Sequence, residues 1–593
     1  MNSTAKSVFP IVAVIFLLRL PFLNQAIQGD DVYYIAAAQH AQIEPLHPNH
    51  IHYVFEGREV DFRGFPHPPL NAWMLAGLIA IFGDVHEIPF HFAYIAFSLI
   101  AALSMYSLAR RFSPHPIWAT LLFIAAPAFV VNGNSLESDI PFLAFWMAGI
   151  ALFVSRRYAW AAVCLTLAAM AAVQAVAAIP ILALYTWLNE RRNRAAWATA
   201  LTPIAGIIGW QVFEFISSGQ FPAAVAAGYQ QTYGYQRGAL KLRNAGGLAV
   251  HACFLVCPLL LPVAWGTSRR RRDPDTLFLA GWITLFFLSA LVFFYAGSAR
   301  YLLPMIAPVA LLVSRIRTRW LAAGFAIQIA LSLGLAIVSY QHWGAYRDFA
   351  AQLPNAEHRR VWVNAEWGLR YYLESRGALP LHRDQFVPTG DLVVESELAY
   401  PVPYQRQLRA LIPVMDRTIA PRIPLRIIGL DSHSGYSTVD KGLLPFGISR
   451  GPIDRVRAAI LEDRQPSLSY LPMNAPQAAE QILYGIYALE SDRWRWMSDQ
   501  AAIVLKSPPS ALPVHVALYI PDSDPARTVS ISIDGKLVVT KTFPAPGSYS
   551  IDTAPVILTR PAALLQIAVD RTWSVPGDNR KLGIILTEAG FRK

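Results

Sequence analysis

The sequence predicts a polytopic α-helical membrane protein whose C-terminal third is soluble and consists of an α/β module and a β-sandwich. Three observations support this class. Of the 593 residues, 54% are hydrophobic and only 15% are charged, a composition too apolar for a soluble enzyme. Apolar runs close to membrane-spanning length recur up to Tyr340, and beyond Tyr340 the composition turns polar and strand-rich.

The membrane helices are predicted from runs that approach the roughly 20 apolar residues needed to span a bilayer, and about eleven runs qualify. They are residues 8–23, 88–108, 117–131, 140–154, 158–171, 173–188, 197–216, 248–265, 277–295, 301–313 and 320–340. The stretch Pro68–Phe82 is predicted to be an interfacial helix, because counting it as a span would invert every later basic loop.

The orientation follows from the basic residues, which give a net charge of +11. They lie in short clusters between apolar runs, a pattern typical of cytoplasmic loops rather than of a nucleic-acid-binding surface. The first run follows Lys6 and lacks a convincing cleavage site, so it is predicted to be retained with its N-terminus inside. Five basic loops then fall inside: 110–111, 156–157, 191–194, 269–272 and 315–319. The polar loops and the C-terminal third are therefore expected outside.

The soluble third is predicted in two parts that follow a membrane domain of residues 1–340, whose first outer loop is 24–87. In residues 341–472, "RRVWVNAEWGLRYYLESRG" indicates a strand and a helix, and "GDLVVESE" and "RIPLRIIGLD" indicate further strands. In residues 473–593, "VHVALYI" alternates, and "TVSISIDGKLVVTKTF" indicates a hairpin. These patterns favour an α/β module followed by a β-sandwich.

Two acidic motifs are predicted to lie on the outer face. Asp30 and Asp31 follow the first apolar run, and Asp139 precedes the fourth in "NSLESDIPFLAF". Each motif has a simple alternative explanation, because an acidic residue before a helix can cap its N-terminus. Capping needs only one carboxylate of the doublet, and two acidic motifs on one membrane face favour a shared functional site.

Cations are expected near the same face. Arg19 and Arg300 lie at the outer ends of predicted spans, where a charge is costly and usually functional, although a long side chain can also snorkel to the interface. The outer loop "GYQQTYGYQRGALKLRN" mixes basic and tyrosine side chains. This mixture suits an anionic amphiphile, and it is equally ordinary for a membrane anchor.

The histidines of "HPNHIH", which are His47, His50 and His52, lack the regular helical spacing of strong zinc motifs. Metal binding is the alternative for these histidines and for His67, and hydrogen-bonding roles are favoured. The cysteines Cys164, Cys253 and Cys257 all lie in apolar segments, so neither a disulfide framework nor a cysteine metal site is predicted in the polar regions.

The motifs "GDDVYYIAAA", "GFPHPPLNAWMLAGLIAIFG", "SLESDIPFLAFWMAGIALF" and "ARYLLPMIAPVALL" resemble, in this order, the GT-C superfamily of membrane glycosyltransferases. The branch is the one that contains protein O-mannosyltransferases and the lipid A aminoarabinose transferase. The resemblance covers the chain to about Tyr340. It implies a GT-C-like fold, a polyprenyl-phosphate-linked sugar donor, and an acidic pair that supplies the catalytic base. Two positions depart from the family pattern: relatives often have Glu at the position of Asp31, and some have Lys at the position of His67.

The resemblance implies an inverting glycosyltransferase. Transfer from a lipid phosphate needs no general acid, because the phosphate leaves as a stable anion, and a single carboxylate suffices to take the acceptor proton. The hypothesis makes Asp30 the base, Asp31 its companion and Asp139 a supporting group. The residues expected to bind substrate are Arg300, Tyr301, His67, Arg19, Arg237, Lys241, Arg243 and Tyr233. Asp31 and Asp139 are also the candidates for a divalent metal, which the sequence does not establish.

Two alternatives stay open: a transporter or flippase for a lipid-linked sugar, and a non-catalytic scaffold that binds surface glycans. Transporters often contain inverted repeats, which the sequence does not display, and a scaffold would leave the three aspartates without a shared role. The sugar and the acceptor cannot be identified from the sequence, because lipid, glycan and protein hydroxyls all suit one base. The resemblance implies a bacterial inner membrane with the soluble third in the periplasm.

Overall fold

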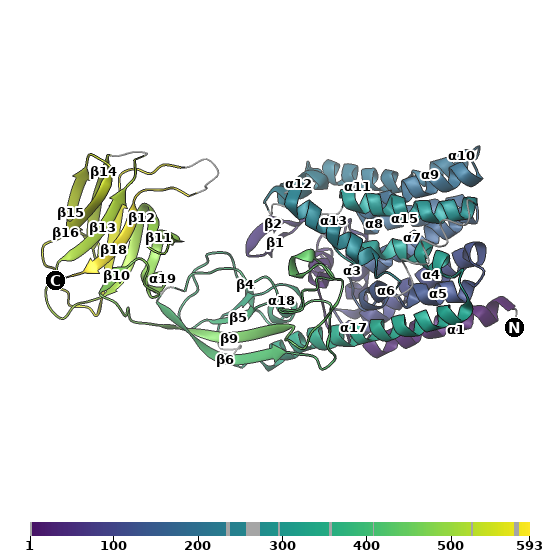
Figure 1. Ribbon diagram of the computed structural model, residues 1–593, viewed down its shortest axis with the longest axis horizontal. Helices are drawn as coiled ribbons and strands as arrows, with labels where there is room; N and C mark the ends of the chain where they lie inside the picture. The colour runs from purple at the N-terminus through teal and green to yellow at the C-terminus, as the bar shows by residue number, and fades with distance from the viewer. Residues whose placement is uncertain are drawn as a thin grey trace.

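The computed structural model describes residues 3–232, 238–256, 273–293, 297–354, 359–406, 408–522, 526–574 and 580–592. Three parts follow one another along its long axis (Figure 1): a helical part at the N-terminal end, a central α/β module, and a β-rich domain that contains the C-terminus. The predicted order of the three parts is therefore observed. The boundaries 1–340, 341–472 and 473–593 remain predictions.

The helical part is built largely from short helices. Their bounds are α1 Ser3–Arg19, α2 Asp31–His40, α3 Leu70–Phe82, α4 Glu87–Phe112, α5 Pro116–Ile124, α6 Pro127–Asn132, α7 Asp139–Val154, α8 Tyr158–Ala171, α9 Ala178–Asn189, α10 Arg194–Ala200, α11 Thr202–Ser218, α12 Pro222–Thr232, α13 Gly238–Ala252, α15 Pro274–Phe293, α16 Leu303–Val313 and α17 Thr318–Gln352. A two-stranded hairpin, β1 His52–Phe55 and β2 Arg58–Asp61, lies between α2 and α3.

Fewer helices than predicted are long enough to cross a bilayer. Over the described residues, α4, α17 and residues 274–292 of α15 combine sufficient length and hydropathy, and the bent pair α10–α11 would make a fourth span if it acts as one. Six further apolar helices have only 10–17 residues. Of the roughly eleven spans predicted, three or four therefore correspond to helices of sufficient length among the described residues. Run 117–131, for example, is divided between α5 and α6 because Ala126 is extended before Pro127.

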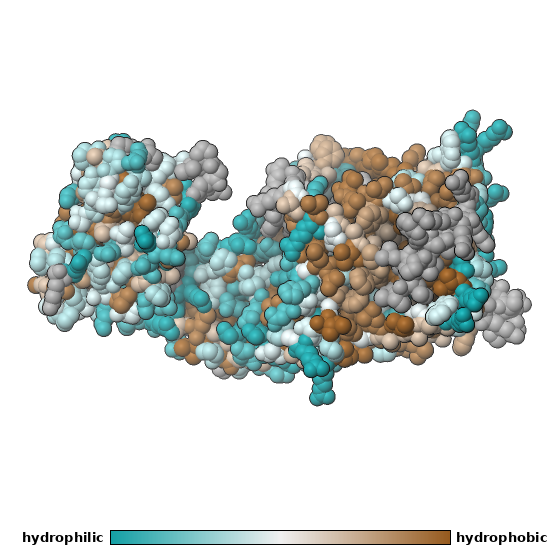
Figure 2. Space-filling model, in the orientation of Figure 1, coloured by the Kyte–Doolittle hydropathy of each residue, from teal (hydrophilic) through white to brown (hydrophobic). Residues whose placement is uncertain are grey.

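The helical part carries a broad hydrophobic surface, and polar residues gather at its ends (Figure 2). At the end away from the α/β module, the C-terminus of α4, the N-terminus of α15 and the segment after α16 meet. Arg111 pairs with Asp275 at 2.7 Å, and Arg315 donates to the Thr276 hydroxyl at 2.6 Å. Predicted basic loops therefore gather at one end, as the charge pattern requires. The basic cluster 269–272 lies outside the described residues.

The α/β module contains a five-stranded sheet of order β4-β3-β5-β9-β6. Its elements are β3 Val361–Asn364, α18 Trp367–Glu374, β4 Leu379–Pro380, β5 Leu392–Ser396, β6 Arg409–Ile419 and β9 Asp454–Asp463. The predicted strand–helix unit corresponds to β3 and α18 and is confirmed. In the segment "RIPLRIIGLD", predicted to contain a strand, only Leu425–Arg426 forms one, β7, which pairs with β8 at Gly447–Ile448.

The module packs against the helices. Helix α17 continues past the predicted boundary at Tyr340 and carries Trp343 and Tyr346 into a core shared with the module. The Tyr346 hydroxyl donates to Asp454 of β9 at 2.7 Å. The polar composition that begins at Tyr340 therefore starts within one helix and does not mark the end of that helix.

The C-terminal domain is β-rich, as predicted, and its strands surround their own core. The strands are β10 Tyr470–Pro472, β11 Ile482–Glu490, β12 Trp494–Lys506, β13 Val514–Ile520, β14 Arg527–Ile533, β15 Lys536–Phe543, β16 Gly547–Asp552, β17 Ala562–Val569 and β18 Ile585–Phe591. The hairpin β14–β15 is confirmed, with Asp534 and Gly535 at positive φ in its turn.

The two separate sheets of the predicted sandwich are not found. All nine strands belong to one hydrogen-bonded sheet, because the long strand β12 pairs with β18 near its start and with β17 near its end. The edge strands β15 and β16 approach each other where Phe543 contacts Tyr549, with ring centroids 4.5 Å apart. The sheet is therefore nearly closed, like a barrel.

Candidate active site

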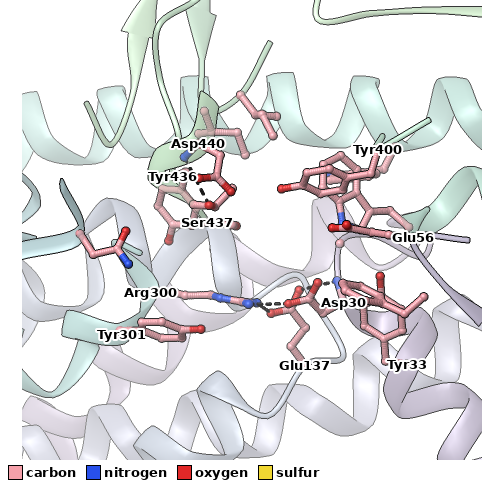
Figure 3. A pocket seen from close by; sticks show the side chains of 18 of the residues that line it. Asp30, Tyr33, Glu56, Glu137, Arg300, Tyr301, Tyr400, Tyr436, Ser437 and Asp440 are labelled. Carbon is pink, nitrogen blue, oxygen red and sulfur yellow. Dashed lines mark hydrogen bonds and ion pairs between the residues drawn. The ribbon is translucent and has the colours of Figure 1, made fainter. Parts of the chain in front are cut away.

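A cavity of about 440 Å³ lies where the helical part meets the α/β module. Its lining comes from parts of the chain far apart in sequence, and Figure 3 shows the polar side chains converging on it. The residues lining it are Gly29, Asp30, Tyr33, Phe55, Glu56, Glu137, Leu240, Asn244, Arg300, Tyr301, Trp343, Trp367, Tyr400, Ile427, Ile428, Tyr436, Ser437, Thr438 and Asp440. The first outer loop, the loop before α7, the start of α16 and the module all contribute.

At the floor of this cavity one guanidinium meets three carboxylates. Arg300 forms charged hydrogen bonds to Asp30 and Glu137, and its Nη1 lies 3.7 Å from an oxygen of Asp139. Glu137 and Asp139 retain only 9% and 6% of their side-chain exposure, whereas Asp30 retains 31%. Asp30 is thus the carboxylate of this cluster with the greatest access to the cavity. We call these four residues the acidic–arginine cluster.

The backbone around Asp30 is shaped for this contact. Gly29 has φ +45°, a conformation that favours glycine, and a Cβ there would lie 2.7 Å from Glu137 Oε1. The Asp30 N–H donates to that same oxygen at 3.1 Å. The Asp30 side chain makes no capping hydrogen bond to α2, so the capping alternative does not account for it.

Asp31 has a different environment from its neighbour. It is fully buried and accepts hydrogen bonds from the N–H groups of Leu136 at 2.7 Å and Gln28 at 3.1 Å, and from the Ser135 hydroxyl at 3.2 Å. Burial raises the pKa of the Asp31 carboxyl to about 7, although these hydrogen bonds act in the opposite direction. Asp31 therefore ties the first outer loop to the loop before α7, and it does not line the cavity.

A second cavity, of about 490 Å³, adjoins the first at Tyr301, which lines both. Its other lining residues are Phe65, Pro66, His67, Ala172, Val173, Gln174, Ile207, Trp210, Gln211, Pro222, Ala223, Ala226 and Ala227. His67 Nδ1 lies 3.3 Å from the Ser138 hydroxyl. Burial, with a smaller effect from Arg300, lowers the pKa of His67 to about 4. His67 is therefore neutral near pH 7 and offers a hydrogen bond rather than a charge.

Arg19 lies outside the residues that line the two cavities. It is buried, and its guanidinium donates to the carbonyls of Phe129 and Val130 at 2.8 Å each and to the Ser98 hydroxyl at 3.1 Å. These carbonyls belong to α6, so Arg19 fixes the position of that short helix. The geometry accordingly favours packing over substrate binding for Arg19.

The basic loop before and within α13 contributes less than expected. Lys241 is exposed and Arg243 donates to the Val439 carbonyl at 2.6 Å, and neither lines the two cavities. Their neighbours Leu240 and Asn244 do line the first cavity. Tyr233 and Arg237 lie outside the described residues.

The sequence interpretation missed several cavity residues. Glu137 stands two positions before Asp139 in a motif already recognised as acidic, so inspecting that motif more closely would have found it. Trp367, Tyr400 and Tyr436 come from the α/β module. No local pattern marks them, because only the docking of the module brings them to the cavity.

The acidic–arginine cluster is a poor match to a divalent cation site. Arg300 already supplies positive charge between the carboxylates, and three donors occupy Asp31. Among the described residues, metal-ligating side chains gather instead at His47, His50 and Glu214. The suggestion that Asp31 and Asp139 bind a metal thus finds no geometric support.

Comparison with known proteins supports the predicted class, the membrane glycosyltransferases. Residues 66–213 match the sequence model of a family described as dolichyl-phosphate-mannose-protein mannosyltransferase, which confirms the predicted resemblance over this segment. The segment includes Glu137 and Asp139 of the cluster.

Among the solved structures to which the chain shows similarity are two crystal structures of ArnT from Cupriavidus metallidurans. The form bound to undecaprenyl phosphate is 15% identical with a TM-score of 0.48, and the apo form is 13% identical with a TM-score of 0.45. Each comparison covers 67% of this chain and 94% of the ArnT chain. No curated protein sequence matches the chain.

Proposed function

We propose that this protein is an integral-membrane glycosyltransferase that moves a sugar from a polyprenyl-phosphate carrier to a hydroxyl acceptor, with Asp30 as the general base. The observation that carries the proposal is the position of Asp30, which is the most exposed carboxylate of the acidic–arginine cluster and lines the first cavity. The family match over residues 66–213 supports the reaction class.

The environments of the two adjacent aspartates support Asp30 rather than Asp31 as the base. A base must reach the acceptor proton directly or through one water. Asp30 faces the cavity, whereas Asp31 is buried and engaged by three donors from the protein. Asp31 then acts as a positioning residue, because it holds the loop that carries Glu137.

In the proposed reaction the acceptor oxygen attacks the anomeric carbon from the face opposite the phosphate. The bond between that carbon and the phosphate oxygen breaks, a glycosidic bond forms, and the anomeric configuration inverts. The hydroxyl proton passes to the Asp30 carboxylate, and polyprenyl phosphate leaves with the electron pair. No general acid is required because the leaving phosphate is a stable anion.

Arg300 is positioned to link binding of the donor phosphate to release of the Asp30 carboxylate. In the described structure its guanidinium is shared between Asp30 and Glu137. A donor phosphate would compete for the same guanidinium, which suits bidentate binding of phosphate. Such an exchange frees the Asp30 carboxylate to accept a proton, while Glu137 and Asp139 keep Arg300 in position. Donor binding and base activation would thereby be coupled.

The two cavities suggest separate places for the substrates. The second cavity is bounded by apolar side chains of α11 and α12, such as Ile207, Trp210 and Ala223, and is suited to the start of a prenyl chain. Tyr301 lies at the junction of the cavities, beside Arg300. The phosphate would lie near this junction, which directs the sugar toward Asp30.

The test is a transfer assay with purified protein and a polyprenyl-phosphate sugar. The change Asp30→Asn should lower turnover by roughly 10²–10⁴-fold, the usual contribution of a general base. Asp416→Asn is a matched control, since Asp416 lies in the module and pairs with Arg457 at 3.2 Å, away from the cavity. A folded Asp30→Asn protein with near wild-type turnover would eliminate the assigned role.

The α/β module is proposed to contact the acceptor, because Tyr436, Ser437 and Asp440 face the acidic–arginine cluster across the cavity (Figure 3). Asp440→Asn should raise KM for the acceptor several-fold and change kcat little, since binding is weakened equally in ground and transition states. An unchanged acceptor KM, measured against Asp416→Asn, would place the acceptor elsewhere.

The proposed location is the bacterial inner membrane, with the N-terminus inside and the cavity, the module and the β-rich domain in the periplasm. The charge pattern of the loops and the gathering of Arg111 and Arg315 at the opposite end support this orientation. The acceptor is a hydroxyl of a lipid, a glycan or a protein.

A further inference from the structure

Two histidines of the first outer loop meet a glutamate of α11, outside the residues that line the two cavities. His50 Nε2 lies 2.7 Å and His47 Nδ1 lies 3.8 Å from Glu214 Oε2. The potential ligand atoms of the three residues all lie within 4.8 Å of one another. About 160 positions of sequence separate the loop from α11, so no local motif reveals this group.

Two features of this group of residues carry a free-energy cost that a bound ligand would remove. Glu214 retains only 5% of its side-chain exposure, and a buried carboxylate needs a positive partner. His50, which lies within hydrogen-bond distance of Glu214, is uncharged when unprotonated. Arg63 acts electrostatically on Glu214 but is already paired with Asp61. In addition, His47 Nδ1 is buried and has no hydrogen-bond partner among the described residues. A cation bound between the three residues would satisfy the carboxylate and this nitrogen together.

We propose that His47, His50 and Glu214 bind a divalent transition-metal ion of the zinc class. Two imidazole nitrogens and one carboxylate oxygen are ligands that zinc prefers, whereas magnesium and calcium prefer oxygen ligands alone. Tetrahedral zinc with ligands at about 2.0–2.1 Å separates neighbouring ligand atoms by roughly 3.3 Å. The observed separations of 2.7 and 3.8 Å lie on either side of that value, so small side-chain shifts complete the site. Three protein ligands leave a fourth position for water.

The metal would hold the first outer loop against α11. The His47 ring already stacks on Phe213, with centroids 5.2 Å apart, and on His50 at 4.4 Å. One turn before Glu214, Trp210 and Gln211 line the second cavity. The ion therefore acts as a structural clamp at the wall of that cavity. This role is independent of the proposed transfer reaction.

The test measures zinc directly in the full chain, purified without a polyhistidine tag and stripped with a chelator. After zinc is returned and the excess removed, elemental analysis should find one ion per chain, and zinc should raise the melting temperature. Cobalt in its place should give the visible absorption of a tetrahedral site. His47→Gln and Glu214→Gln should each weaken zinc binding by more than the 10–100-fold typical of a second-shell change.

His52→Gln is the matched control, because His52 belongs to the same motif but is exposed and pairs with Glu59 at 3.1 Å. It should bind zinc as the wild type does. His47→Gln keeps the test decisive if Glu214→Gln fails to fold, since His47 Nδ1 has no hydrogen bond to lose among the described residues. A wild type that binds zinc no more tightly than His47→Gln would overturn the proposal and leave a plain His–Glu contact.

Discussion

The charged side chains at the two ends of the helical part differ in their exposure to solvent. At the outer end, Arg300 is enclosed with Asp30, Glu137 and Asp139 beneath the α/β module. At the other end, Arg111 pairs with Asp275 but keeps half of its side chain exposed. Exposed pairs contribute about 0–1 kcal/mol, whereas enclosed charges lose hydration that their mutual attraction only partly restores. We therefore attribute the enclosed cluster to the proposed transfer reaction. The exposed pair is attributed to the charge pattern that orients the helices.

The largest difference should appear when each arginine is neutralised. Arg300→Gln leaves three carboxylates without their counter-charge and should lower the free energy of unfolding by about 3–5 kcal/mol, the usual effect of removing one partner of a buried pair. It should also abolish transfer. Thermal melting in detergent checks the first effect and the transfer assay the second. A melting temperature equal to that of Arg111→Gln would remove the distinction between the two ends.

A second prediction concerns pH. The folded-state pKa of Asp31 is raised to about 7 from an ordinary value of 3.8, so the folded protein holds this proton more tightly than the unfolded chain. Stability should therefore fall as pH rises from about 4 to about 7, with a slope on the order of 1 kcal/mol per pH unit. Asp31→Asn should flatten this dependence in melting curves recorded between pH 5 and 8. An unchanged slope would assign it to another group.

The smallest effect is expected at the exposed end. Arg111→Gln should change the free energy of unfolding by less than about 1 kcal/mol, and the change should diminish at high salt because exposed pairs are screened. Melting at low and high ionic strength checks this. A larger, salt-independent loss would mean that the pair contributes to the packed structure and does not only mark the proposed cytoplasmic side.

Local patterns predicted much of the fold. The hairpin at Asp534–Gly535, the strand–helix unit of β3 and α18, and helix α3 were all predicted from turn chemistry or periodicity, which depend on neighbouring residues. The single continuous sheet of the C-terminal domain was not predicted. Its formation depends on β12 pairing with both β17 and β18, and these contacts are distant in sequence. Over the described residues, fewer long spans are found than predicted, because an apolar run does not show where a helix breaks.

The candidate site, like the fold, was predicted only in part. The sequence by itself determined the residue types and their face: an acidic doublet, a second acidic motif and an arginine, all expected outside. Only the tertiary structure separated Asp30 from Asp31, added Glu137 and Tyr436, and gave Arg19 a packing role. The physical reason is that burial and hydrogen bonding depend on which distant segments meet. The same reason makes Glu214 a partner of His47 and His50, because that contact exists only once α11 lies beside the first outer loop.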